Sequence, residues 1–142
     1  EKDSMNNTIK KEQVHTPPFT GNALIGYTFS KLKLTIDLSA NINSPMLLPV
    51  LPNDYRPSHS PWFCLMNIQF TKKFAYGIEV YAGIKNILNF IPENPIMRPQ
   101  DPFDKYVNDP IVNPNGYTFD AGYNYAPVQG IKGFFGLRYS VR

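Results

Sequence analysis

The sequence has little of the chemistry that enzymes and metalloproteins use. It holds one cysteine, Cys64, so no disulfide can form within the chain, and its two histidines, His15 and His59, stand alone. It contains no CxxC pair, no HExxH motif and no glycine-rich phosphate loop. We therefore expect no catalytic residues, no metal site and no cofactor, and we do not expect an enzyme.

Long apolar runs are missing as well. A transmembrane helix needs about 20 consecutive apolar residues, and this chain, with a mean hydropathy of −0.31, has no such stretch. The net charge of +3 is small, and basic residues never occur more than two in a row. Neither transmembrane helices nor nucleic acid as a partner are therefore expected.

Proline is abundant, yet it is absent from five runs in which apolar and polar residues alternate. These runs span residues 20–30, 32–43, 62–72, 76–90 and 131–141. In the clearest run, 32–43, leucine, isoleucine and alanine alternate with lysine, threonine, aspartate, serine and asparagine. Period-two alternation is typical of a β-strand with one apolar and one polar face.

The length of these runs favours a membrane. A run of about 11 residues is roughly twice the usual strand length in soluble domains. At ~3.3 Å per residue and a tilt of ~40°, it would cross roughly 27 Å, about the apolar band of an outer-membrane barrel. We therefore expect an all-β protein, an antiparallel transmembrane β-barrel. A soluble β-sandwich also alternates and remains the alternative.

The connections between the runs are of two kinds. Two are short, and two are long, at residues 44–61 and 91–130, where twelve of the fourteen prolines lie. Short turns at one end and long loops at the other are typical of outer-membrane barrels, whose long loops are extracellular. Residues 1–19 would then be the end of a preceding extracellular loop. Aromatic residues gather near both ends of the runs, as interfacial girdles do.

Five strands cannot close a barrel, because the two edge strands would leave backbone groups unpaired in lipid. We expect the missing strands to come from an upstream segment or from a separate chain. The start at Glu1, with no signal peptide, also indicates a piece of a longer polypeptide. A small complete barrel would need strands in proline-rich segments, which oppose them.

The charged residues counted in the alternation fall on the polar face, which is the lumen of a barrel. The predicted lumen-facing charges are Lys33, Asp37, Glu79, Lys85, Lys132 and Arg138. Runs 76–90 and 131–141 follow one another, so they are expected to pair, and Glu79 is then predicted to reach Arg138.

The long loops combine acidic, amide and tyrosine side chains. A stretch of about forty residues without regular structure suggests a functional loop. We predict that Tyr55, Arg56, Arg98 and Tyr106 are the residues that contact a ligand or partner at the mouth of the barrel.

Five segments carry a family resemblance. They are PPFTGNALIGYTF, NIQFTKKF, GIEVYAGIKNILNFIPENP, RPQDPFD and YAPVQGIKGFFGLRYS. In this order they resemble the C-terminal end of a TonB-dependent outer-membrane receptor of the Bacteroidetes type. GIKNILNF is similar to the family's penultimate-strand pattern GVKNLFN, and the ending GFFGLRYS is similar to its final strand.

The resemblance implies that residues 1–142 are the C-terminal part, five strands, of a barrel of roughly 22 strands with a plugged lumen. It implies a bacterial outer-membrane protein that imports a scarce nutrient, such as a ferric siderophore, haem, cobalamin or a metal, into the periplasm. The implied partners are the rest of the barrel with its N-terminal plug, TonB and membrane lipid, with a surface lipoprotein as a further candidate. A porin-like or adhesive barrel and a soluble binding module remain alternatives.

Overall fold

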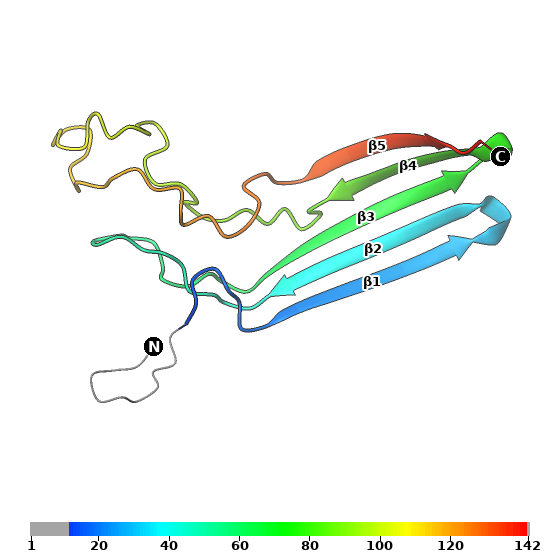
Figure 1. Ribbon diagram of the computed structural model, residues 1–142, viewed down its shortest axis with the longest axis horizontal. Helices are drawn as coiled ribbons and strands as arrows, with labels where there is room; N and C mark the ends of the chain where they lie inside the picture. The colour runs from blue at the N-terminus through cyan, green and yellow to red at the C-terminus, as the bar shows by residue number, and fades with distance from the viewer. Residues whose placement is uncertain (1–11, 142) are drawn as a thin grey trace. The chain divides into compact units, whose positions relative to one another are not determined.

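The computed structural model describes residues 12–141. The chain forms one antiparallel sheet of five strands in the order β1-β2-β3-β4-β5 (Figure 1). The strands are β1 Thr20–Phe29, β2 Leu34–Asn43, β3 Phe63–Lys73, β4 Ile78–Lys85 and β5 Lys132–Tyr139. The described residues contain no α-helix, only two short 3₁₀ turns, η1 Ser30–Leu32 and η2 Ala75–Gly77. The prediction of an all-β protein with five antiparallel strands is confirmed.

The strand register keeps every alternating run in phase with its neighbours. Leu38 of β2 lies opposite Ile25 of β1 and Ile68 of β3. We call this side the apolar face; it carries the odd-numbered residues of β1 and β5 and the even-numbered residues of β2, β3 and β4. The remaining strand residues form the polar face. A shift of one residue would move a strand's whole apolar set to the other side, so the alternation itself specifies this register.

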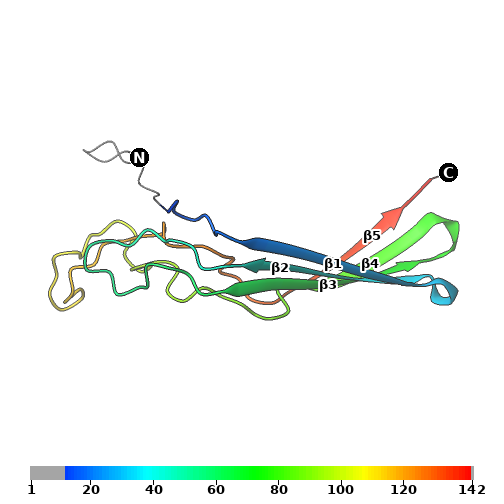
Figure 2. The ribbon, with the colours of Figure 1, turned by 90° about the horizontal axis from the view of Figure 1, so that it is seen from below.

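The apolar face is not the inside of a core. Ile25 is 65% exposed and Phe135 is 73% exposed, and both point away from the polar face. Seen from its edge in Figure 2, the sheet is a single layer. Among the described residues of the sheet, the buried large hydrophobic side chain is Phe63, which lies on the polar face and stacks on Phe90. A β-sandwich needs two sheets, whereas the described residues form one.

The two short connections are tight turns, as expected, but they change the assignment of one residue. Lys33 follows η1 in the left-handed region, with φ of 48°. This backbone conformation reverses the chain, so β2 begins at Leu34 rather than at residue 32. Lys33 is therefore an exposed turn residue, and the prediction that it is a charge on the polar face of a strand is wrong.

The fourth strand is also shorter than predicted. The run 76–90 contributes only Ile78–Lys85 to the sheet. At its end, Asn86 takes a φ of 53°, and its side-chain amide donates to the carbonyl of Phe90 at 2.8 Å and accepts from the backbone N–H of Phe90 at 3.0 Å. Asparagine tolerates the left-handed conformation and closes such turns with its side chain. Leu88, counted in the alternating run, consequently lies outside the strand.

The chain divides into two compact units, which we describe separately. The sheet unit comprises Phe19–Asn43, Trp62–Pro92 and Ala126–Arg142. The loop unit comprises Glu1–Pro18, of which residues 12–18 are described, with Ser44–Pro61 and Glu93–Tyr125. The predicted loops 44–61 and 91–130 thus fall largely in the loop unit, whereas part of the predicted loop end 1–19 lies outside the described residues.

The loop unit has no strand or helix in its described part but has a small core of its own. The buried apolar side chains in it are Met46, Leu48, Met97 and Tyr123. Isolated β-bridges join Leu47 to His59 and Met97 to Asp120. Long loops that pack on their own side chains are compact surface structures rather than free tails.

Candidate functional site

In the sheet unit, the candidate site is the polar face, where amide and hydroxyl side chains bond across the strands. The Asn41 side chain donates to that of Asn22 at 2.8 Å and accepts from that of Asn43 at 2.5 Å. On the next strand, the Asn67 amide donates to the Ser39 hydroxyl at 3.1 Å. These bonds hold neutral polar groups in fixed rows without a net charge.

The charges of the polar face include one geometrically close pair. Arg138 Nη1 lies 2.7 Å from Glu79 Oε1, and the two residues face each other in the β4–β5 register. Lys73 Nζ lies 4.0 Å from the other Glu79 oxygen. The predicted pairing of Glu79 with Arg138 is confirmed. Such exposed cross-strand pairs contribute about 0.2–1 kcal/mol each.

Three further charges of the polar face stand apart from ion pairs within the described chain. Lys85 and Lys132 lie directly opposite each other in the register, and Lys85 Nζ lies 5.7 Å from the Phe134 ring. Asp37, Ser39 and Lys85 border a shallow hollow of about 280 Å³ on the sheet unit. Leu24 and Phe134 also line it, so the hollow combines hydroxyl, amide and charged groups with apolar ones.

In the loop unit, Arg56 is the centre of a buried charge cluster. Its side chain donates to Asp54 at 2.7 Å and to Asp120 at 2.5 Å, and its guanidinium lies 4.1 Å from the centre of the Tyr123 ring. The side chains of Arg56 and Asp54 are each only 1% exposed. Burial lowers the pKa of Arg56, but the hydrogen bonds to Asp54 and Asp120 outweigh it and raise the pKa. The hydrogen bond from the Arg56 side chain holds the pKa of Asp54 below its usual value.

A second buried pair joins Arg98 and Asp101. Arg98 Nη2 lies 2.6 Å from Asp101 Oδ2, and the Asp101 carboxylate also accepts the backbone N–H groups of Lys105 and Tyr106, each at 2.9 Å. The bond from the Tyr106 backbone is the main cause that lowers the pKa of Asp101, with the Arg98 side chain acting in the same direction. The carboxylate thereby holds the start of the 101–106 turn together.

The two arginines thus differ in role from the prediction. Arg56 and Arg98 are both buried and paired within the loop unit, and we assign them to its folding instead of to ligand contact. Arginine in a loop suggested recognition of a ligand, but Asp54 and Asp101, close in the sequence, already neutralise the two side chains.

The two predicted tyrosines are exposed, as a contact role requires. Tyr106 is 57% exposed, and Tyr55 is exposed beside Tyr117, with ring centres 5.5 Å apart. The structure adds Phe103 and Ile111, which are more exposed than either tyrosine and which the sequence reasoning missed. Both residues directly follow a proline and lie in segments without an alternating pattern. This position could have predicted that their side chains are exposed.

The buried carboxylates predict how the loop unit responds to acid. Because the pKa values of Asp54 and Asp101 are lowered by folding, their contribution to stability is present above the unfolded value of about 3.9. It is lost as the pH falls through the still lower folded values. We expect hydrogen-exchange protection of the backbone N–H groups of Lys105 and Tyr106 to be constant from pH 7 to about pH 4 and to fall below it.

The control for this experiment is β3, whose ladder hydrogen bonds involve no carboxylate. Protection of residues 66–70 should persist at a pH at which the loop unit has opened. Equal loss of protection in β3 and in the loop unit, or no loss in either, would contradict the assignment of these carboxylates.

In the described chain, no group of His, Cys, Asp or Glu side chains is arranged to hold a metal ion. Within residues 12–141 there is no helix that is both long enough and apolar enough to cross a membrane. No family model, no curated protein and no solved structure matches this chain.

Proposed function

We propose that this chain forms five consecutive wall strands of a TonB-dependent outer-membrane receptor, which imports a scarce nutrient into the periplasm. The observation that carries the proposal is the apolar face: it runs across all five strands, and its side chains are exposed or half-buried, none of them buried as in a core. In a barrel wall, lipid covers such a face. The segments that resemble this receptor family give the proposal its specific form.

Strand length supports a membrane-spanning wall. β1 and β2 each have 10 residues and β3 has 11. At about 3.3 Å per residue and a tilt of about 40°, these strands would cross roughly 25–28 Å, which matches the apolar band of outer-membrane barrels. The short turns η1 and η2 lie at one end of the strands, and the long connections leave from the other, as in barrels with periplasmic turns and extracellular loops.

The open edges of the sheet support a wall that continues beyond these strands. Within residues 12–141, β1 and β5 each pair on one side only. In lipid, every unpaired backbone group costs several kcal/mol, so further strands must cover both edges. In a receptor with a barrel of roughly 22 strands, an upstream segment or a separate chain supplies them, together with the plug.

The polar face takes the role of the lumen wall in this proposal. Its amide and hydroxyl rows, the Glu79–Arg138 pair and the hollow beside Asp37 would face the plug. The loop unit takes the role of the extracellular part, where Tyr55 and Tyr106 are available to a nutrient or to a surface lipoprotein. TonB would supply the energy through the plug.

The test of the wall is single-cysteine labelling in outer membranes that contain the complete polypeptide, with Cys64→Ser as background. Leu38→Cys and Ser39→Cys are adjacent in β2 but lie on opposite faces. We expect a lipid-soluble thiol reagent to label Leu38→Cys and a small charged reagent to label Ser39→Cys. Labelling of both positions by the charged reagent alone would contradict a lipid-covered face.

The same preparation tests the transport class. The complete polypeptide should co-purify with the periplasmic domain of TonB, whereas a porin-like barrel should not. A correct labelling pattern without TonB binding would retain the barrel wall and reject the receptor.

A further inference from the structure

The short-turn end of the sheet unit gathers lysines on two neighbouring turns. Lys31 and Lys33 lie in the β1–β2 turn, and Lys72 and Lys73 end β3. The two groups are adjacent, because the backbone N–H of Lys73 donates to the carbonyl of Lys33 at 2.9 Å. We call these four residues the turn lysines.

Little negative charge opposes the turn lysines. In the described segments at this end, residues 29–34, 71–79 and 138–141, the only carboxylate is Glu79. Glu79 is already paired with Arg138 at 2.7 Å, while Lys73 Nζ is 4.0 Å away. The end therefore keeps a net positive charge, which favours an anionic partner.

Apolar groups lie beside this charge. Lys72 falls on the apolar face, opposite Leu34 and Val80, and its ammonium bends back to the carbonyl of Leu32 and lies 5.9 Å from the Phe74 ring. Tyr76, in the next turn, is 90% exposed. A lysine whose stem crosses an apolar surface while its charge reaches the rim is typical of a membrane interface.

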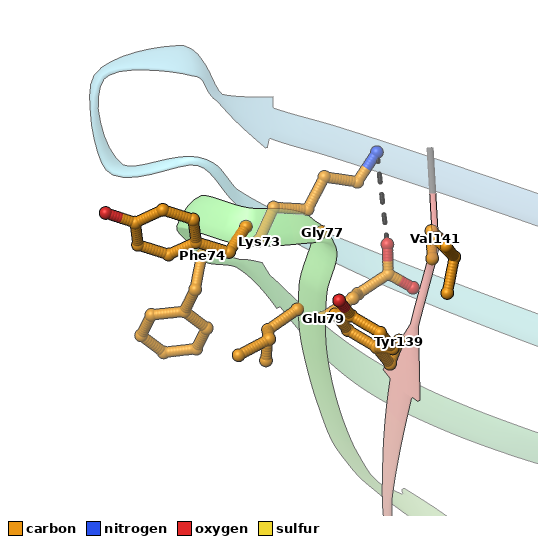
Figure 3. Close-up of a pocket in the computed structure, with 9 residues that line it drawn as sticks. Lys73, Phe74, Gly77, Glu79, Tyr139 and Val141 are labelled. Carbon is orange, nitrogen blue, oxygen red and sulfur yellow. Dashed lines mark ion pairs between the residues drawn. The ribbon is translucent and has the colours of Figure 1, made fainter.

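A hollow at the same end lies between the charged surface of the turn lysines and the apolar groups beside it. It measures about 590 Å³ and is lined by Lys73, Phe74, Tyr76, Glu79, Tyr139 and Val141. In Figure 3 a dashed line joins the side chains of Lys73 and Glu79, and Tyr139 lies at the end of β5 with Val141 just beyond it. The hollow places apolar and aromatic side chains beside the turn lysines, while Lys73 and Glu79 themselves lie on the polar face.

We infer that the short-turn end binds the headgroups of anionic phospholipids. The phosphate would lie against the turn lysines, and the start of the acyl chains would lie against the aromatic rim. Free phosphate would satisfy the lysines but would leave the apolar rim uncovered, so the combination favours a lipid. The inference rests on the proposed function, which places this end at the periplasmic leaflet of the outer membrane.

The test reconstitutes the complete polypeptide in phosphatidylcholine vesicles and measures association of spin-labelled phosphatidylglycerol and phosphatidylcholine. The test variant is Lys31→Gln/Lys33→Gln, which removes two exposed charges from one turn. The matched control is Lys85→Gln/Lys132→Gln, which removes two charges from the opposite end, on the polar face. We expect the wild type to prefer phosphatidylglycerol, the test variant to lose roughly 30-fold of that preference, and the control to retain it.

Three results would overturn the inference. They are an equal association of both lipids with the wild type, an equal loss in the control variant, and displacement of phosphatidylglycerol by inorganic phosphate as effective as by unlabelled phosphatidylglycerol. Membrane insertion is monitored separately, by heat-modifiable migration in gels. Failure to insert would reject the proposed function and this inference with it, whereas insertion without lipid preference would reject the inference alone.

Discussion

Alanine in place of Arg56 should unfold the loop unit while the sheet unit stays paired. The substitution removes the guanidinium that lies 2.7 Å from Asp54 and 2.5 Å from Asp120. Asp54 would remain buried without its counter-charge, and Tyr123 would lose the group that covers its ring. Breaking a buried pair in this way costs roughly 3–5 kcal/mol, which is large for a unit whose apolar core is as small as this one.

The measurement is hydrogen exchange and limited proteolysis of the complete polypeptide. Protection should fall in residues 44–61 and 93–125 and remain in the strands. Arg138→Ala is the matched control, since it removes an arginine from an exposed pair worth at most about 1 kcal/mol. Arg56→Lys keeps the charge but not the planar fork of donors. Its loss of protection in the loops should therefore be smaller than that of Arg56→Ala and larger than that of Arg138→Ala. If Arg56→Ala and Arg138→Ala affected the loops equally, the central role of Arg56 would be refuted.

Arginine in place of Leu38 should prevent stable insertion of the sheet in a membrane. Leu38 lies in the middle of β2, between Ile25 and Ile68 on the apolar face. A lipid-facing arginine at the midplane of a barrel costs about 2–4 kcal/mol, and the cost falls toward the interfaces. We expect a strong loss of folded protein from outer membranes and a lower urea midpoint in lipid vesicles.

The matched control is Ser39→Arg, one residue along the same strand. Ser39 lies on the polar face, where it accepts a hydrogen bond from Asn67, and an added charge there meets water or polar groups. Its cost should be about 1 kcal/mol, that of one lost hydrogen bond. Should Leu38→Arg be tolerated as well as Ser39→Arg, the apolar face would not be in contact with lipid.

The strands and their faces could be predicted because alternation is a local signal. Residues 32–43 show which side chains share a face without any knowledge of the neighbours, and the hairpin order then pairs Glu79 with Arg138. The ends of strands were predicted less well. Lys33 and Asn86 depart from the strand conformation by one backbone angle each, with φ of 48° and 53°. A period-two pattern of apolar residues does not reveal such a change.

The loop unit could not be predicted, because its contacts are not local. Arg56 and Asp120 are 64 positions apart in the chain, and nothing near either residue indicates the other. Likewise, the backbone bridge between Met97 and Asp120 sets which side chains are buried. An arginine in a loop has the same local pattern whether it meets a ligand or an aspartate.

The order of apolar and polar residues along this chain is thus enough to establish a sheet with two unlike faces, since neighbouring side chains in a strand must point to opposite sides. Which loop residues are exposed, and which charges neutralise each other in the loops, depends on segments that meet only after folding. For Arg56 and Tyr106, both expected at a binding surface, the folded chain alone separates a buried structural cation from an exposed aromatic ring.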